Sequence, residues 1–419
     1  MASMGAAIKN WLSGLAALFL LAGGDVIAQA AEFSVNRGIN LDQWTTWPDE
    51  SRWDDARVLL PFPEWRRTIR QPELEGLRAA GFDFVRMPVD PSPFLSARAG
   101  PLRDRLFHEV LESARLIQRA GLKVVVDLHL IPAGGNRSIG MSQVMDDPDL
   151  FDRYVDLAAR MARTLSGEDP SRLALELMNE PVTECEGAAA ERWTERLKRL
   201  HAAAREGGPK LTLVLAGGCW GSAEGLVALD PAEFGDADVL WTFHSYAPFL
   251  VTHQGATWAG DFIRYVTGIP YPPNAVPAPE MAEAVERIRR RIRDEAPWSR
   301  RSGMLAYLDE EVAKIDTAEK LRAALDEPFA LVSAWAERHG IAPGKILLGE
   351  FGIIRQEYGG DFVMPAASRA AYVRDMIGLA ERHGYAWSVW SYGGAFGVVE
   401  EFEGRKAEPD VLEVVRGLR

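Results

Sequence analysis

Residues 173–182 read LALELMNEPV, an apolar stretch that ends abruptly in an amide and a carboxylate, Asn179 and Glu180. A short run of leucine and alanine is typical of a buried strand in a parallel sheet. Burying a carboxylate costs several kcal/mol unless the group is paired or hydrogen-bonded, so a fold retains one only with a partner or a function. We therefore interpret this stretch as a strand that leaves a protein core and enters a functional site.

Seven further short apolar runs alternate with amphipathic helical stretches. The eight predicted strands lie at 34–40, 82–88, 123–129, 173–179, 211–217, 239–245, 345–351 and 386–392. Four glycines directly follow predicted helices, at positions where a left-handed residue commonly ends a helix: Gly81, Gly121, Gly340 and Gly384. Strands that alternate with helices predict parallel pairing, and eight such units predict an α/β fold of the (β/α)8 TIM barrel type.

A doubly wound open sheet is the alternative architecture. Such a sheet ordinarily shows a glycine-rich phosphate-binding loop after its first strand. The corresponding stretch here, RGINLDQW at 37–44, has no G-x-G-x-x-G pattern. The barrel is therefore the favoured fold.

The N-terminal residues 1–30 are interpreted as a secretory signal peptide. Lys9 precedes an apolar run at 11–24, and residues 28–30 (AQA) match the small-x-small pattern of a cleavage site. The run is shorter than the roughly 20 residues of a transmembrane helix, although an uncleaved anchor is an alternative. We expect residues 31–419 to form a single domain, and the mature protein to be secreted or periplasmic, monomeric and without stable membrane association.

The charge of the chain narrows its possible partners. Its formal net charge of -13 argues against nucleic acid, because phosphate binding needs clustered Lys and Arg. The one basic run, at 287–293, is interleaved with Ile at helical spacing and is interpreted as a solvated helix face.

Two glutamates end strands that should be buried, Glu180 after the fourth strand and Glu350 in the seventh. In a TIM barrel the C-terminal strand ends line the open mouth, and the fourth and seventh strands lie across that mouth from each other. Paired carboxylates across a gap are typical of glycoside hydrolysis: one, protonated, donates to the leaving oxygen, and the other, ionised, attacks the anomeric carbon. The alternative is that each glutamate pairs with a basic neighbour and only holds loops.

Six further side chains end predicted strands and form the expected substrate-binding set: Arg86, His129, Asn179, His244, Tyr246 and Trp390. Arg86 is expected to keep a carboxylate ionised by lowering its pKa. Asn179 is expected to donate to the sugar 2-hydroxyl, and Trp390 to offer a ring face to the sugar. Taken singly, each has a structural alternative, such as an ion pair, a hydrogen-bonded histidine or a plug of the barrel.

The chain resembles glycoside hydrolase family 5, within the retaining (β/α)8 clan. The matching motifs, in chain order, are RGIN (37–40), VRMPVD (85–90), VVVDLH (124–129), LELMNEP (175–181), FHSY (243–246), LLGEFG (347–352) and WSVW (387–390). The resemblance implies that Glu180 is the general acid/base and Glu350 the nucleophile. It also implies that the six side chains above occupy active-site positions, and that neither a metal nor an organic cofactor is used.

The expected function is that of a retaining endo-β-1,4-glucanase with a β-glucan substrate. A β-1,3-glucanase, a β-mannanase or a transglycosylase on the same site remain open, as does a non-catalytic carbohydrate-binding barrel. A metal-dependent barrel hydrolase would use the histidines of the DLH and FHS runs. The sequence has no H-x-H pattern after the first strand, and a metal site would leave the two glutamates unexplained.

About 100 residues separate the sixth strand from the seventh, more than one crossover helix needs. We interpret 250–316 as an insertion on the catalytic rim. Its aromatic residues either wall a substrate cleft or anchor the long loop: Trp258, Tyr265, Tyr271 and Trp298.

The chain has two cysteines, Cys185 after the fourth strand and Cys219 after the fifth. On a barrel these positions fall on adjacent loops of the same rim. A disulfide that braces the acid/base loop is therefore our hypothesis, and it requires Cα atoms within about 7 Å.

Overall fold

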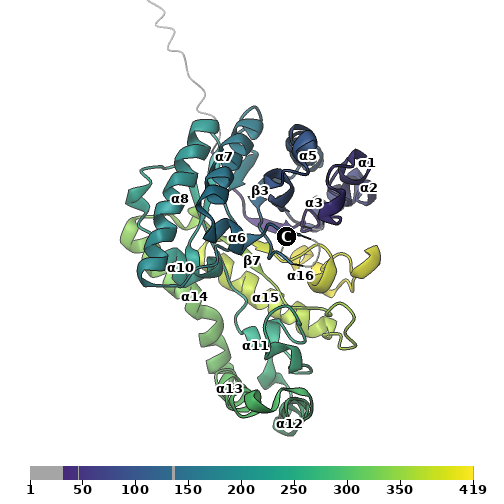
Figure 1. The fold of residues 1–419 in the computed structure, drawn as a ribbon. Coiled ribbons are helices and arrows are strands. Elements are labelled where there is room, and N and C mark those ends of the chain that lie inside the picture. The colour runs from purple at the N-terminus through teal and green to yellow at the C-terminus, as the bar shows by residue number, and fades with distance from the viewer. Residues whose placement is uncertain (1–31, 46, 135–136, 419) are drawn as a thin grey trace, which may run out of the picture. The chain divides into compact units, whose positions relative to one another are not determined.

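The computed structural model describes residues 32–45, 47–134 and 137–418, so the predicted signal peptide lies outside the described residues. Glu32–Arg419 form one compact unit. Eight parallel strands close into a barrel in chain order (Figure 1), which confirms the (β/α)8 prediction. The strands are β1 Arg37–Asn40, β2 Phe84–Val89, β3 Lys123–Leu128, β4 Leu173–Glu176, β5 Thr212–Ala216, β6 Val239–His244, β7 Ile346–Phe351 and β8 Ala386–Val389.

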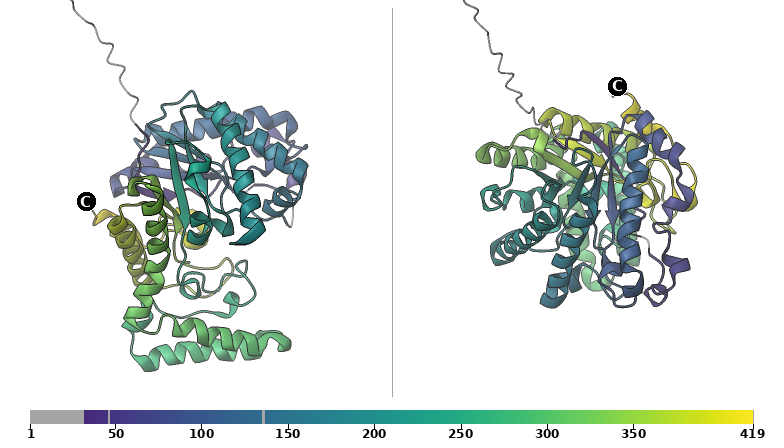
Figure 2. Two further views of the ribbon diagram at one scale, coloured as in Figure 1. Left: turned by 90° about the vertical axis from the view of Figure 1, so that its left-hand side faces the viewer. Right: turned by 90° about the horizontal axis from the view of Figure 1, so that it is seen from above.

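Long helices cover the outside of the barrel (Figure 2). In chain order, the helices of the described residues are α1 Ala56–Leu59, α2 Trp65–Thr68, α3 Gln71–Ala80, α4 Ser92–Leu95, α5 Arg103–Arg119, α6 Met141–Asp146, α7 Pro148–Leu165, α8 Gly187–Gly207, α9 Gly218–Gly221, α10 Ala223–Val227, α11 Phe249–Thr252, α12 Ala278–Glu295, α13 Arg301–Ala313, α14 Ala318–His339, α15 Ala366–His383 and α16 Asp410–Arg416. The helix α7 shows why they pack, because it buries Tyr154, Leu157, Met161 and Leu165 at spacings of three and four. Each such burial stabilises the fold by about 1.5–3 kcal/mol.

The base of the barrel is filled by one residue from each of seven strands, together with two residues that precede β1. This cluster consists of Phe33, Val35, Phe84, Val125, Ala174, Val214, Leu240, Leu347 and Ala386. Gly38 of β1 leaves room for it, because a Cβ there would lie 2.3 Å from the Phe84 ring. Successive strand residues point to opposite faces, so Arg86, two positions after Phe84, also faces the interior but one layer nearer the mouth.

Strand β7 contains an irregularity that aims Glu350 into the barrel. Phe243 pairs with Leu348, but the next residue of β6, His244, pairs with Glu350, so β7 has one extra residue, Gly349. Strict alternation from Leu347 would turn Glu350 outward, and the bulge reverses this. The extra residue has to be small, since a Cβ on Gly349 would lie 2.5 Å from Thr242 Oγ1.

Strand β4 ends three residues earlier than its apolar pattern predicts. Regular pairing stops at Glu176, and the chain continues through Asn179, whose N–H donates to the Leu128 carbonyl at 3.0 Å. Glu180 then adopts a positive φ of 40°. The change of direction that places the Glu180 side chain at the mouth therefore belongs to the loop and not to the strand.

The predicted insertion after the sixth strand is present. It contains α11 and a pair of helices, α12 and α13, that extend beyond the barrel before α14 returns to it (Figures 1 and 2). The basic run lies on α12, where Val285, Ile288 and Ile292 are buried and the arginines pair with nearby acids such as Glu286 and Asp309. Among the described residues, no helix combines the length and apolar character needed to cross a membrane.

Candidate active site

The structure brings the two glutamates together at the mouth of the barrel. A carboxylate oxygen of Glu180, one of Glu350 and a ring nitrogen of His244 lie within 4.8 Å of one another. The Glu350 side chain is 5% exposed and that of Glu180 is 32% exposed, so Glu180 faces the solvent side of the mouth. The pair has the proximity that a two-carboxylate reaction needs.

Arg86 lies beneath the pair, fully buried, and binds several acids at once. Its Nη1 donates to Glu350 Oε1 at 2.7 Å, and its Nε and Nη2 bind both oxygens of Glu176 at 2.7 and 2.9 Å. Asp127 Oδ2 lies 2.9 Å from Nη2. Burial alone would lower the pKa of Arg86, but the surrounding carboxylates raise it well above its usual value, so Arg86 stays charged. Its permanent positive charge therefore lies against Oε1 of Glu350.

A chain of hydrogen bonds orients Asn179. Its Oδ1 accepts from Arg86 Nη2 at 2.8 Å, and its Nδ2 lies 3.2 Å from His129 Nε2. Burial lowers the pKa of His129, so the ring is neutral, donates from Nδ1 to Asp127 Oδ2 at 2.7 Å and accepts from Asn179 at Nε2. This chain fixes the amide orientation and leaves the second Nδ2 hydrogen of Asn179 for another acceptor.

His244 links the two glutamates. Its Nδ1 lies 2.8 Å from Glu180 Oε1 and 3.7 Å from Glu350 Oε2. Burial lowers the pKa of His244 to about 4, so the ring is neutral near pH 7. A neutral imidazole accepts from a protonated carboxyl group or donates to an ionised one at the same atom, depending on its tautomer. His244 can therefore contact Glu180 in both of its protonation states.

Burial also raises the pKa of Glu180 above its ordinary value, although the positive charges around it act in the opposite direction. The Tyr246 hydroxyl donates to Glu350 Oε2 at 2.8 Å, so both oxygens of Glu350 are hydrogen-bonded. The two carboxyl groups thus lie in different surroundings: that of Glu180 has a raised pKa, and that of Glu350 accepts a hydrogen bond at each oxygen. Acid/base and nucleophile roles require two carboxyl groups with different environments.

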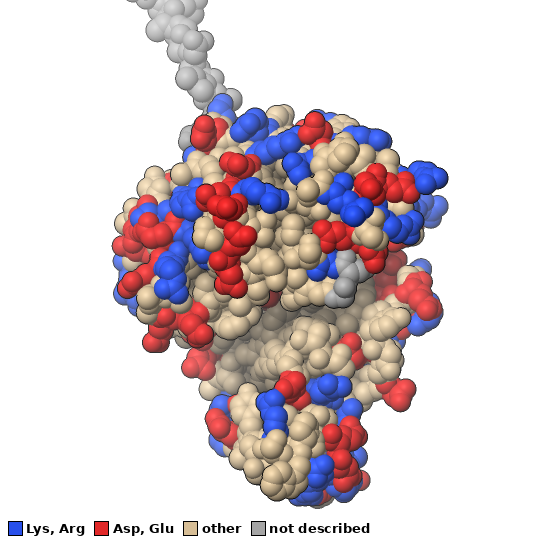
Figure 3. All heavy atoms as spheres, viewed as in Figure 1, with Lys and Arg blue, Asp and Glu red and all other residues tan. Residues whose placement is uncertain are grey.

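Trp390 completes the predicted set at the end of β8. Its ring stacks on His129 with a centroid distance of 5.5 Å and an interplanar angle of 16°. All eight predicted site residues therefore lie at one end of the barrel. Figure 3 shows this face hollowed between the barrel body and the insertion, with mostly uncharged surface inside the hollow.

Three buried residues of this network were not among the predicted site residues: Asn40, Asp127 and Glu176. Asn40 Oδ1 accepts from Arg86 at 2.9 Å, and Glu176 binds Arg86 through both oxygens. Glu176 had a visible signal, because it is an acid in the middle of the apolar run LALELM. The arginine needs these partners, since an unpaired buried charge is strongly unfavourable.

The four insertion aromatics separate into two groups. Tyr265 and Tyr271 are buried and anchor the loop, and the Tyr271 hydroxyl donates to Asp375 at 2.7 Å. Trp258 is 61% exposed and contacts the ring of His253, which in turn packs against Tyr246. Trp298 is 85% exposed between α12 and α13. Of the four, Trp258 connects through ring contacts to the catalytic mouth.

The structure joins Cys185 and Cys219 in a disulfide with a Cα separation of 4.6 Å. The linked loops also share two hydrogen bonds, from the Cys219 N–H to Thr183 Oγ1 at 3.0 Å and from the Trp220 N–H to the Pro181 carbonyl at 3.1 Å. The disulfide therefore braces the loop that directly follows Glu180.

Replacing both cysteines, Cys185→Ser with Cys219→Ser, is expected to lower the free energy of unfolding by about 3–4 kcal/mol, the chain-entropy value for a loop of this length. Urea unfolding of both proteins measures the difference. Thiol reduction should shift the wild-type midpoint toward that of the double variant and leave the double variant where it is. If the urea midpoint of the wild-type protein is the same with and without the reductant, the disulfide contributes nothing to stability.

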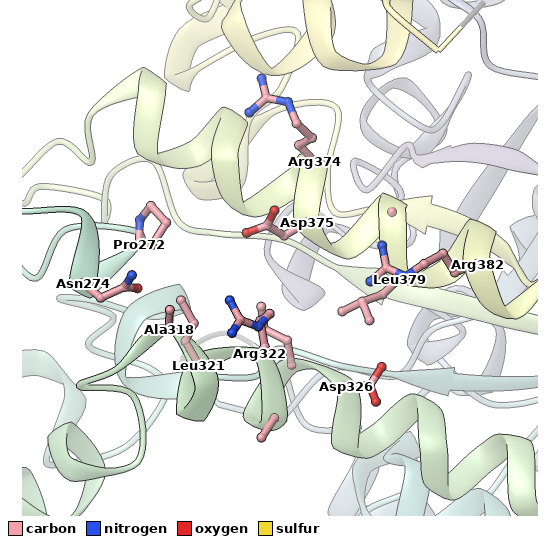
Figure 4. Close-up of a pocket in the computed structure, with 13 residues that line it drawn as sticks. Pro272, Asn274, Ala318, Leu321, Arg322, Asp326, Arg374, Asp375, Leu379 and Arg382 are labelled. Carbon is pink, nitrogen blue, oxygen red and sulfur yellow. The ribbon is translucent and has the colours of Figure 1, made fainter.

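A second cavity, of about 790 Å³, lies between α14 and α15 (Figure 4). Arg322 and Asp326 come from α14, and Arg374, Asp375 and Arg382 from α15. The lining contains none of the predicted site residues. Three arginines and two aspartates therefore line this cavity together, away from the predicted site residues.

Comparison with known proteins identifies relatives of this barrel. The chain is 24% identical over 326 residues to Endoglucanase C of Acetivibrio thermocellus, covering 77% of this chain and 84% of the relative. It is 28% identical over 229 residues to Cellodextrinase A of Ruminococcus flavefaciens, covering 54% of this chain and 63% of that protein.

Solved structures share the fold. The cellulose synthase subunit Z of Clostridioides difficile has a TM-score of 0.63 at 21% identity, over 91% of this chain and 99% of that one. Endoglucanase Cel5A of Thermotoga maritima has a TM-score of 0.60 at 21% identity, over 91% and 96%. The model of the cellulase family, glycosyl hydrolase family 5, matches residues 62–396. The chain therefore belongs to glycoside hydrolase family 5 and is a glycoside hydrolase.

Proposed function

We propose that this protein is an endo-β-1,4-glucanase that retains anomeric configuration. The observation that supports the proposal most directly is the proximity of Glu180 and Glu350, which have carboxylate oxygens within 4.8 Å. Retaining glycosidases place their two carboxyl groups roughly 5–5.5 Å apart, whereas inverting enzymes leave roughly 6.5–9.5 Å for a water molecule.

In the first step, Glu350 attacks the anomeric carbon while Glu180 gives its proton to the glycosidic oxygen. The bond from carbon to that oxygen breaks, and a covalent glycosyl-enzyme on Glu350 remains. In the second step, ionised Glu180 takes a proton from water, and the water oxygen displaces Glu350. Two inversions leave the configuration unchanged.

The surrounding groups fit these steps. Arg86 and Tyr246 each donate to an oxygen of Glu350, which orients this carboxyl group for attack. His244 Nδ1 can accept a hydrogen bond from Glu180 while Glu180 is protonated, and it can donate one after Glu180 has lost its proton. The free amide hydrogen of Asn179 is the proposed donor to the sugar 2-hydroxyl, a contact that strengthens in the transition state.

The substrate proposal rests on the relatives and on the shape of the site. Several relatives are named endoglucanases, and the hollow in Figure 3 extends across the face of the barrel, which suits a polymer bound along its length. We further infer export, because the chain begins with a signal-like segment and contains a disulfide, a bond that persists mainly outside the cytoplasm.

A panel of β-1,4-glucan, mixed-linkage β-glucan, β-1,3-glucan and β-mannan tests the proposal. We expect new reducing ends from the β-1,4-glucan, together with an early fall in viscosity that reports cleavage inside chains. Glu350→Gln serves as the inactive control. Cleavage of mannan or β-1,3-glucan alone would contradict the substrate, and release of small sugars without a viscosity change would contradict endo action. Products longer than the substrate would indicate transglycosylation.

A further inference from the structure

Three consecutive residues of α9 adopt the left-handed backbone conformation. Cys219 and Trp220 each have a φ of 54°, and Gly221 has a φ of 66°. Apart from Glu180 and Glu403, no other non-glycine residue in the described part of the chain has a positive φ. Left-handed residues ordinarily occur singly and are usually glycine, because a Cβ crowds the following carbonyl oxygen. A run that includes a cysteine and a tryptophan is therefore strained, and such strain persists only where the surrounding structure enforces it.

This left-handed turn, residues 219–221, lies directly against the proposed acid/base. A Cβ added to Gly221 would lie 3.6 Å from both Cα and Cγ of Glu180, and 3.8 Å from His244 Nδ1. His244 Nδ1 is the atom that lies 2.8 Å from Glu180 Oε1. Glu180 itself has a φ of 40°, a backbone conformation that a non-glycine residue seldom adopts without restraint. The turn therefore packs against both partners of the hydrogen bond that orients the acid/base.

Three links hold the turn to the segment that directly follows Glu180. They are the Cys185–Cys219 disulfide, the hydrogen bond from the Cys219 N–H to Thr183 Oγ1 at 3.0 Å, and the hydrogen bond from the Trp220 N–H to the Pro181 carbonyl at 3.1 Å. Thr183 reaches the turn because a glycine faces it, since a Cβ on Gly218 would lie 2.3 Å from Thr183 Oγ1. These links supply the restraint that a strained turn needs.

We propose that the disulfide and Thr183 hold this turn in its left-handed conformation so that the turn positions Glu180 for proton transfer. The inference rests on the proposed glycosidase function. Relaxation of the turn removes packing from one side of Glu180 and His244, and a displacement of about 1 Å in a catalytic group can cost about 100-fold in rate. Reduction of the disulfide removes one of the two side-chain restraints, so the positioning of Glu180 depends on the redox state of the cysteines.

The nucleophile is held by other parts of the barrel. Arg86 comes from β2 and Tyr246 follows β6, and they donate to the two oxygens of Glu350. Loss of the restraints on the turn should therefore weaken proton donation and leave nucleophilic attack in place. The difference is measurable, because a leaving group that departs without protonation needs only the attack.

Two aryl cellobiosides measure the two contributions separately. Phenol is a poor leaving group that needs the proton of Glu180, whereas dinitrophenolate departs without one. For Thr183→Val, and for Cys185→Ser with Cys219→Ser, we expect kcat/KM on phenyl β-cellobioside to fall by about 10- to 100-fold. On dinitrophenyl β-cellobioside, kcat/KM should remain near that of wild type. The same active molecules cleave both substrates, so a partly unfolded sample does not change the ratio of the two values.

Three controls accompany these variants. Thr183→Ser keeps the hydroxyl acceptor and should keep the wild-type ratio. Thr164→Val should also keep it, because the Thr164 hydroxyl donates to the Arg160 carbonyl within α7. Dithiothreitol, a dithiol, gives the disulfide two electrons and two protons and becomes a disulfide itself. The ratio of the reduced wild-type enzyme should then match that of the double cysteine variant, which should not respond to the reagent.

The outcomes are distinct. An equal loss on both substrates would overturn the inference, because the turn would then support the fold or Glu350 and not the proton donor. Wild-type ratios in both variants would also overturn it and leave the glycosidase proposal intact. An unchanged ratio in fully reduced wild-type enzyme, with both thiols detected by alkylation and mass spectrometry, would overturn the role of the disulfide. Wild-type enzyme that cleaves neither cellobioside nor any glucan would overturn the proposed function as well.

Discussion

Glu350→Gln is expected to lower kcat on β-1,4-glucan by about 10⁴-fold or more, because the amide cannot form the covalent glycosyl-enzyme. The side chain keeps its shape, and the amide oxygen still accepts from Arg86 or Tyr246. We therefore expect the variant to fold and to bind substrate. Initial rates from reducing-end release, together with circular dichroism and thermal unfolding, measure the two effects separately.

Glu64→Gln is the matched control, since Glu64 is exposed on the outside of the barrel and makes no side-chain cap hydrogen bond. It should retain wild-type rates. Azide gives a sharper result with Glu350→Gly, where the small anion can attack in place of the missing carboxylate and yield an α-glycosyl azide. Glu350→Gln with rates like those of wild type would place the chemistry at another residue.

Glu180→Gln is the second large expected effect, a loss of about 10²–10⁴-fold on glucan, the usual contribution of a positioned acid/base. The loss in the first step should shrink for a dinitrophenyl glycoside, whose leaving group departs without protonation. Deglycosylation would then limit the rate, so kcat should fall more than kcat/KM. A nucleophile is needed for both substrates, whereas an acid is needed only for the glucan. A smaller loss on the dinitrophenyl glycoside therefore identifies Glu180 as the acid/base.

The pH profile tests the same residue. Glu180 must be protonated for the first step, so wild-type kcat/KM should fall as pH rises through its pKa. Burial raises that pKa, which moves the fall to a higher pH than an exposed glutamate would give. In Glu180→Gln this basic limb should disappear. A basic limb that survives the substitution unchanged would assign it to a different group.

The barrel and most of its site were predictable because strand and helix periodicities recur eight times and polar residues end the strands. Arg86, Asn179 and Tyr246 illustrate this, since each directly follows or ends an apolar run. The fold class was confirmed by the closed parallel barrel. Local patterns were sufficient here because a parallel barrel brings every C-terminal strand end to one mouth.

Other features depend on contacts that sequence patterns do not encode. Alternation along β7 would point Glu350 outward, and only the pairing of His244 with Glu350 reveals the bulge. Glu176 appeared as an interruption of an apolar run, and its partner Arg86 is 90 positions away.

The most direct test of the central claim is to trap the covalent intermediate. A 2-deoxy-2-fluoro glycoside with a good leaving group should inactivate the enzyme. The fluorine slows both steps, and the good leaving group speeds only the first, so the glycosyl-enzyme accumulates. Mass spectrometry of the digested protein should then find one added fluoroglycosyl group on the peptide that contains Glu350. A label on Glu180 or any other residue, or turnover without a covalent adduct and with an inverted product, would contradict the proposed mechanism.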